Sequence, residues 1–353
     1  MSIITRAPRF FSLVLLFASL YFVPFNSFAQ VKTDPIAERM LIYQRSYGGW
    51  PKAIHEKKVV YEDALTEEQK KEVLSGVNNE DGTFDNKATS REIRYLVKAY
   101  KETQNPAYLK AAQKGIDYIL KAQYANGGWP QYYPLKNLYR GQITYNDNAM
   151  INLLSILQDI VEKVNDFEVV DAAYIPKAEK AVKSGINCII KTQVKTKGKL
   201  TAWAAQYDEN SLTPAKARAF EPASLSSAES VGIVQFLMRI PNPSKEIKDA
   251  VTAAVEWFDE VKIVGYATKE IDAPSLPKGK DRVVVEDPNS VIWSRFYELE
   301  TFKPIFIGRD AVIRYSLAEI DYERRNGYGW YGTWPAKVLQ KEFPKWKKIN
   351  GVN

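Results

Sequence analysis

The sequence predicts an all-α protein of the (α/α)3 type, a toroid of helix pairs with irregular loops and a few short strands. Three observations support this fold class. Helical periodicity recurs along the chain, a helix leading into a Gly-Gly-Trp-Pro turn occurs twice, and stretches with strand character are few and short. The composition agrees, because a hydrophobic fraction of 45% excludes a disordered chain and provides for a sizeable core.

The repeated unit is a helix that leads to a glutamine and then to a tryptophan turn. The first two expected helices are residues 36–44 and 108–123, and each is followed by Gly-Gly-Trp-Pro. A looser third copy covers residues 185–193 and is followed by Trp203, while residues 328–335 echo the turn near the end of the chain. Repeats of this length with two helices each predict helix pairs arranged around a ring.

Three further helices are expected between these turns, and each follows acidic or amide residues. Apolar side chains recur at helical spacing after Asp85-Asn86, after Asp147-Asn148 and after Glu221. In a ring of helix pairs the inner helices run in the same direction, so these residues gather at one rim. As N-caps they would each contribute about 1 kcal/mol. As a group they form an oxygen-rich cluster of the kind that suits calcium, which takes oxygen ligands.

Strand character is limited to two short segments, Arg282–Glu286 and Lys303–Ile307. The stretch Gly265–Asn289 is rich in Pro, Gly and charged residues, which predicts a long loop.

The N-terminus predicts an export signal. Arg6 and Arg9 precede an apolar run over residues 10–23, which is shorter than the roughly 20 residues of a membrane-spanning helix. Small residues at the expected cleavage positions predict removal of residues 1–29, which leaves residues 30–353 as a single catalytic domain. The alternative is an uncleaved anchor. We expect a secreted or periplasmic monomer that has no membrane contact after cleavage and no nucleic-acid partner.

The composition also excludes several kinds of site. The chain has one Cys and one His, so it carries neither a disulfide framework nor a multi-histidine metal site, and a Ser-His-Asp triad is improbable. Any chemistry therefore rests on carboxylates, Arg, Lys, Tyr or an oxygen-ligated metal. The net charge of +7 at pH 7 suits a polyanionic partner, although ordinary solubility charge is an equal explanation.

Arginines accompany the acidic residues. Arg218 lies three residues before Glu221, and Arg295 and Arg309 flank the segment 303–307. A surface location is the usual one for arginine, and Arg218 with Glu221 is also consistent with a simple ion pair worth a few tenths of a kcal/mol.

Together these motifs resemble the family 10 pectate lyases. The resemblance covers residues 43–337, and the strings that carry it are the two Gly-Gly-Trp-Pro turns and residues 143–148, 202–208, 217–221, 293–297 and 308–310. It implies an (α/α)3-type toroid and calcium-assisted cleavage of α-1,4-polygalacturonate by β-elimination. The sequence departs from the family pattern at Ala204 and Tyr207, where Cys and His are frequent, and at Ala311, where Gly is expected.

The resemblance also implies roles for individual residues. Arg218 would be the catalytic base, and Asp85 would lie between metal and substrate near the scissile bond. The calcium ligands would be Asp147, Asn86 and Glu221. Uronate carboxylates would be bound by Arg295 and Arg309, with sugar contacts from Trp203 and Tyr207.

The base is the chemically difficult part of this assignment. β-Elimination removes the C5 proton of a uronate, and a cation on the carboxylate stabilises the charge that develops. Arginine normally stays protonated, with a pKa above about 12. A lysine base, or a metal-bound hydroxide with Arg218 as stabiliser, therefore remains an alternative.

Other readings of the aromatic residues and of the fold remain open. Trp50, Trp129, Tyr132 and Tyr133 are further candidates for sugar contacts, although the turn tryptophans more naturally pack between helix pairs. A glycoside hydrolase that uses Asp85 and Asp147 is one rival function. A terpenoid cyclase lacks its Asp-rich motif here, and a non-catalytic oligouronide-binding toroid is the third rival.

Overall fold

The computed structural model describes residues 1–3 and 32–352, and the chain from Lys32 onward forms one compact unit. The expected signal segment, residues 1–29, lies outside the described residues apart from its first three positions. In the described part of the chain, no helix combines the length and the apolar character needed to cross a membrane. The α-helices are α1 (Pro35–Tyr43), α2 (Glu67–Ser75), α3 (Ser90–Thr103), α4 (Pro106–Ala122), α5 (Ala149–Glu162), α6 (Ile175–Thr192), α7 (Ser227–Arg239), α8 (Lys245–Glu260), α9 (Tyr322–Gly327) and α10 (Phe343–Asn350).

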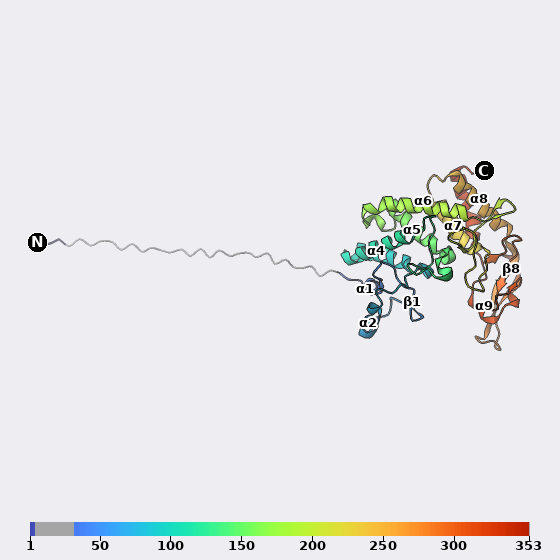
Figure 1. Ribbon diagram of the computed structural model, residues 1–353, viewed down its shortest axis with the longest axis horizontal. Coiled ribbons are helices and arrows are strands. Elements are labelled where there is room, and N and C mark those ends of the chain that lie inside the picture. The colour runs from blue at the N-terminus through green and yellow to red at the C-terminus, as the bar shows by residue number, and fades with distance from the viewer. Residues whose placement is uncertain (4–31, 353) are drawn as a thin grey trace. The chain divides into compact units, whose positions relative to one another are not determined.

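The core of the unit is built from three helix pairs, which confirms the expected (α/α)3 arrangement. Helix α3 pairs with α4, α5 with α6, and α7 with α8, and the members of each pair are consecutive α-helices in the chain (Figure 1). The first members, α3, α5 and α7, contact one another in that order, and so do α4, α6 and α8. Apolar stripes drive this packing, since residues such as Ile93, Leu154 and Val234 are fully buried between the helices.

The repeated glutamine links each helix pair to the next. Gln44 donates from Nε2 to the carbonyl of Gly48 in its own turn and to that of Ala111 in α4. The other two copies make equivalent contacts at 2.8–3.1 Å, as Gln123 joins Gly127 to Ala181 and Gln193 joins Thr201 to Ala250. The sequence repeat is therefore a structural connection that recurs at three helix junctions.

The turn tryptophans are also structural. The indole N–H groups of Trp50, Trp129 and Trp203 donate to carbonyls of the preceding helix at 2.7–2.8 Å, and all three side chains are fully buried. Trp293 makes the same contact with the carbonyl of Phe258 at the end of α8. The fourth copy of the turn is therefore at Trp293. The expected copy at residues 328–335 instead places Trp330 in a second, smaller core, where it bonds to Arg324.

The prediction of a long loop at residues 265–289 is wrong. This stretch forms most of an antiparallel hairpin, β8 (Ile263–Asp272) and β9 (Lys280–Ser294), with its turn at residues 273–279 and an irregularity opposite Gly265. Much of the hairpin is partly exposed on both faces, so charged residues alternate with apolar ones and weaken the strand pattern. The remaining strands have two residues each: β1 (Ala53–Ile54), β2 (Lys57–Lys58), β3 (Ile143–Thr144), β4 (Lys195–Thr196), β5 (Lys199–Leu200), β6 (Gln206–Tyr207), β7 (Leu225–Ser226), β10 (Phe296–Tyr297), β11 (Phe306–Ile307), β12 (Ile313–Arg314) and β13 (Tyr331–Gly332).

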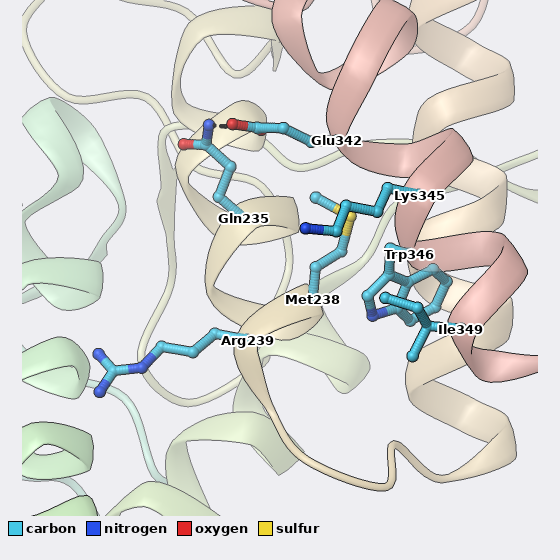
Figure 2. A pocket seen from close by; sticks show the side chains of 7 residues that line it. All are labelled: Gln235, Met238, Arg239, Glu342, Lys345, Trp346 and Ile349. Carbon is cyan, nitrogen blue, oxygen red and sulfur yellow. Dashed lines mark hydrogen bonds between the residues drawn. The ribbon is translucent and has the colours of Figure 1, made fainter.

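The C-terminal helix α10 closes the unit against α7 and α8. A π-helical turn at Val338–Glu342 precedes it, and Trp346 packs into the main core. A surface pocket between α10 and the end of α7 is shown in Figure 2. It lies at the opposite end of α7 from the acidic residues described next, so it belongs to the packing of the C-terminus.

Candidate active site

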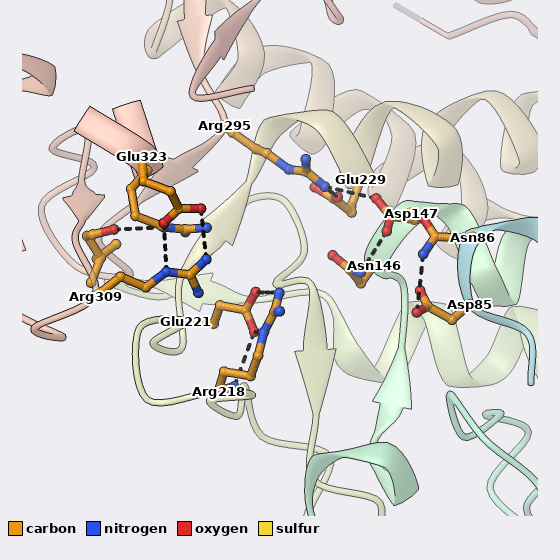
Figure 3. A network of polar contacts seen from close by, with 12 residues as sticks. Asp85, Asn86, Asn146, Asp147, Arg218, Glu221, Glu229, Arg295, Arg309 and Glu323 are labelled. Atoms are coloured by element: carbon orange, nitrogen blue, oxygen red, sulfur yellow. Dashed lines mark hydrogen bonds and ion pairs between the residues drawn. The ribbon is translucent and has the colours of Figure 1, made fainter. Parts of the chain in front are cut away.

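Two short 3-10 turns precede the inner helices and bring the predicted metal ligands together. The turn Asp85–Lys87 leads into α3, and the turn Asn146–Asn148 leads into α5. Asn86 and Asp147 occupy the same place in these turns, with φ of 50° and 51°, a left-handed conformation that Asn and Asp adopt more readily than most residues. The two turns contact each other, so Asn86 lies beside Asp147 (Figure 3).

None of these residues caps its helix in the expected way. The positions directly before α3 and α5 are Thr89 and Asn148, and neither makes a side-chain cap hydrogen bond. The capping explanation of Asp85 and Asp147 is therefore wrong, and their carboxylates point into the cluster instead.

Three carboxylates, Asp85, Asp147 and Glu229, form an acidic cluster at this rim. Arg295 is 14% exposed and lies between two of them, 3.3 Å from Asp147 Oδ1 and in an ion pair with Glu229. Lys52 forms an ion pair with Asp85. Burial raises the pKa of Asp147, Arg295 lowers it, and the carboxylates of Glu229 and Asp85 raise it further. Three carboxylates here meet two cations, Arg295 and Lys52, so the ionised cluster keeps a net negative charge that a bound cation would offset.

Glu229 is the principal residue that the sequence analysis missed. Helix α7 begins at Ser227, and Glu229 lies in its first turn and is 2% exposed, whereas Glu221 lies in the preceding loop. Ser226 donates its hydroxyl to the Glu229 carboxylate. The pattern Ser-x-x-Glu at residues 226–229 is a sequence signature of a helix start, and it indicates a helix that begins after Ser226 and carries Glu229 in its first turn.

Three arginines surround the ring of Phe220 and form an arginine cluster beside the acidic cluster. The guanidinium carbons of Arg218, Arg309 and Arg324 lie 5.0, 4.6 and 4.9 Å from the ring centroid. Arg218 is bound by Glu221, with Nε 2.8 Å from Oε2. Arg309 is bound by Glu323 at 2.8 and 2.9 Å.

The third arginine of the cluster, Arg324, is buried and has no carboxylate partner among the described residues. Its Nε donates to the carbonyl of Ile307 at 3.3 Å, and its guanidinium lies 4.7 Å from the ring centroid of Tyr328. Burial lowers the pKa of Arg324, and neighbouring Arg309 adds to this effect. By contrast, the hydrogen bond that Arg218 donates to Glu221 raises the pKa of Arg218. Arg218 is therefore protonated in this arrangement.

A narrow pocket lies between the segments that carry the two clusters. Asn146 lines it on the side of the acidic cluster, Glu221 and Phe220 line it on the side of the arginines, and Tyr328 lies between them. Burial raises the pKa of Tyr328, while the surrounding charges of Arg295, Glu229, Glu221 and Asp147 act on it in opposite directions. The ring centroid of Tyr328 lies 4.9 Å from the guanidinium carbon of Arg295 and 4.7 Å from that of Arg324, so Tyr328 contacts both clusters.

The structure brings some of the predicted calcium ligands together and keeps one apart. Asn86 and Asp147 are neighbours, whereas Glu221 is occupied by Arg218. Within residues 32–352, no three acidic, His or Cys side chains converge closely enough to hold a metal ion. The oxygen donors suit calcium in type and charge, and Glu221 completes the expected set only when it leaves Arg218.

The predicted sugar contacts of Trp203 and Tyr207 are wrong. Both side chains are fully buried in the main core. The Trp203 indole N–H donates to the carbonyl of Ile189, and the Tyr207 hydroxyl accepts from the backbone N–H of Ala204 at 2.7 Å. Tyr207 also packs edge-on against Tyr145. Both side chains therefore pack in the main core and do not line the site.

The rim of this helix-pair toroid carries crowded carboxylates beside clustered arginines. Carboxylates suit a metal cation and arginines suit an anionic ligand, so the site is typical of proteins that bind an anionic ligand together with a cation. Comparison with known proteins gives the particular family. The family model for pectic acid lyase matches residues 44–339, and the chain belongs to this family and is a pectate lyase.

Solved structures agree with this assignment. The family 10 polysaccharide lyase from Cellvibrio cellulosa is 34% identical, with a TM-score of 0.77 over 90% of this chain and 91% of that chain. A mutant of that enzyme in complex with trigalacturonic acid matches equally well, over 90% of this chain and 92% of that chain. No curated protein sequence matches the chain.

Proposed function

We propose that this protein cleaves α-1,4-polygalacturonate by calcium-assisted β-elimination, with Arg218 as the base that removes the C5 proton. One observation supports this most strongly: three arginines surround a single ring directly beside the crowded carboxylates. A substrate with a carboxylate on every sugar needs such cations, and a neutral polysaccharide does not. The complex of the Cellvibrio enzyme with trigalacturonic acid supports the same substrate class.

Calcium would be held by Asp147, Asn86 and Glu221. When bound, it would place positive charge on the uronate carboxylate and so stabilise the negative charge that develops as the C5 proton leaves. Asp85, which Lys52 binds, would complete the negative surroundings between metal and substrate.

Arg218 becomes a competent base only when Glu221 leaves it, because the hydrogen bond that Arg218 donates to Glu221 raises the pKa of Arg218. The positive charge of neighbouring Arg309 repels that of Arg218 and so favours the neutral form of Arg218. Arg218 takes the C5 proton, the electron pair forms the C4–C5 double bond, and the C4–O4 bond breaks. The released O4 is protonated, and the products are a shortened chain and a 4,5-unsaturated oligogalacturonide.

Arg309 and Arg295 differ in how readily they meet a substrate carboxylate. Arg309 is half exposed and pairs with Glu323. A uronate carboxylate carries the same charge as Glu323, so it would take the place of Glu323 on Arg309. Arg295 is largely buried between Glu229 and Asp147, so it positions these carboxylates and presents only its outer edge. We therefore propose Arg309 as the main carboxylate-binding residue, and Arg295 as a residue that joins the acidic cluster to the substrate.

A second candidate is an inverting or retaining glycoside hydrolase. It needs one protonated carboxylic acid and one carboxylate, and the raised pKa of Asp147 beside Asp85 is the observation that favours it. The product separates the two functions, since hydrolysis yields no double bond.

We also propose that the protein is exported as a monomer and that residues 30–353 are its catalytic domain. The compact unit begins at Lys32, close to the expected cleavage position. A mature N-terminus at Gln30, read by protein sequencing, is the expected result, and retention of Met1 would contradict cleavage.

The role of Arg218 is tested with Arg218→Ala. We expect kcat on polygalacturonate to fall about a thousandfold or more, as for loss of an essential base, while KM changes little. Arg314→Ala is the matched control, because Arg314 is an arginine near the site that pairs with Asp310 outside both clusters. An Arg218→Ala rate within about tenfold of the wild type would exclude Arg218 as the base.

A further inference from the structure

A second, basic pocket continues the candidate active site beyond Asn86. Its volume of about 540 Å³ lies within the range of ligand-binding pockets. The pocket shares Lys52 and Asn86 with the site described above, so a polymer bound there has a direct route into it. The residues that line it are Lys52, Ala53, Glu56, Lys58, Val59, Asn86, Lys87, Ala88 and Arg91.

The charges in this basic pocket are mainly positive and partly uncompensated. Arg91 is paired with the buried Glu92 and lies over the ring of Tyr61, and Lys52 is paired with Asp85. Lys58 and Lys87 are exposed and form no ion pair with any described residue. Glu56 is the one acid in the lining. The pocket therefore offers two cations for an anionic ligand.

The backbone holds one of these lysines in an unfavourable conformation. Lys87 has φ of 66°, in the left-handed region that bulky residues avoid. Its carbonyl accepts a hydrogen bond from the hydroxyl of Ser90 at 3.0 Å, and the turn is closed by Ala88 N–H to the carbonyl of Asp85 at 3.0 Å. Asn or Gly would adopt this conformation at lower cost, so the turn keeps a lysine at a position that the backbone does not favour for one.

We infer that the basic pocket is a distal subsite for the carboxylates of a polyuronate chain. The inference rests on the proposed function. A chain whose reacting sugar lies between Arg218 and Asp147 passes Lys52 and Asn86 and enters the pocket, where Lys58 and Lys87 bind a carboxylate of a more distant sugar. Long chains therefore gain affinity that short oligomers lack, and the cleft accepts chains that extend past the cleavage point.

The test compares a long and a short ligand on one pair of variants. Lys87→Asn removes the charge and keeps a residue that tolerates positive φ, and Lys58→Gln removes the second charge. For the double variant in an Arg218→Ala background, which prevents cleavage of the ligand, we expect Kd for a nonagalacturonate, measured by calorimetry with calcium present, to rise about fivefold or more. Kd for trigalacturonate is expected to stay within about twofold.

Two controls show that the effect belongs to the pocket. Lys183→Gln, which removes an exposed lysine of α6, is expected to change neither Kd. Glu56→Gln removes the acid from the lining and is expected to lower Kd for the nonamer. The melting temperature of each variant shows that it is folded.

The outcomes separate this inference from the proposed function. Equal losses for both ligands, or no loss for either, would overturn the distal subsite whether or not the enzyme is active. Selective loss for the nonamer, together with a wild-type protein that forms no unsaturated product, would support the subsite and contradict the lyase reaction.

Discussion

At the scale of single residues, Glu221 has two possible partners that exclude each other. It now binds Arg218 through both carboxylate oxygens and also accepts from the Arg218 backbone N–H at 3.1 Å. As a calcium ligand it would have to turn away and leave Arg218 without the group that raises its pKa. The same movement would therefore complete the metal site and free the base.

Asp147 allows a test of the metal assignment that does not depend on turnover. Asp147→Asn removes one of three crowded carboxylates and keeps a side chain that tolerates positive φ. We expect its melting temperature in chelator to equal or slightly exceed that of the wild type. Calcium at a hundred times Kd should stabilise the wild type by about 2.7 kcal/mol and leave the variant unchanged, as measured by thermal unfolding.

The control for this experiment is Asp249→Asn, which removes an exposed carboxylate that pairs with Lys245 on α8. It should respond to calcium as the wild type does. An undiminished calcium shift in Asp147→Asn would show that the ion binds elsewhere.

The sequence predicted a common location for several candidate residues and mislocated others, for a physical reason. Arg218, Arg295, Arg309, Asp85, Asn86 and Asp147 all lie at the rim, where polar residues in loops and turns need a specific partner. Trp203 and Tyr207 occur in the same loop sequence but point into the core, and an aromatic residue looks the same in sequence whether it stacks on a sugar or packs on a helix.

At the scale of elements, the helices were predictable because each buries a regular apolar stripe. The first expected helix, residues 36–44, is observed as Pro35–Tyr43, and the repeated Gln marks a real junction between helix pairs. The hairpin β8–β9 was not predictable in the same way. It makes its pairing through backbone hydrogen bonds, and charged side chains stand on both of its faces.

The junctions give a prediction about stability. Gln193 is buried and donates to the carbonyls of Thr201 and Ala250 at 2.8 and 2.9 Å. Gln193→Met keeps the volume but leaves both carbonyls without this donor, so we expect a loss of about 2 kcal/mol in the free energy of unfolding, measured by urea denaturation.

A matched variant at an exposed glutamine shows whether the junction is responsible. Gln235→Met removes a surface hydrogen bond to Glu342, and the expected change is below about 0.5 kcal/mol. Similar losses for both variants would mean that the repeated glutamine is not a structural connection.

At the scale of the whole molecule, the toroid explains why one rim carries the chemistry. The turns that precede α3 and α5 contact each other, and the second of them contacts α7, so residues far apart in the chain meet at that rim. The loop with Arg218 and the segments with Arg295, Arg309 and Arg324 border the same pocket. The fold class and the location of the site followed from the repeat, whereas the pairing of Glu221 with Arg218 needed the structure.

The most direct test of the central claim is ultraviolet absorbance of the wild-type protein incubated with polygalacturonate, first with calcium and then with a chelator. We expect a rising signal from the new C4–C5 double bond, which stops when chelator is added and resumes with excess calcium. A flat trace accompanied by new reducing ends would contradict this expectation, because the protein would then be a hydrolase acting through paired carboxylates.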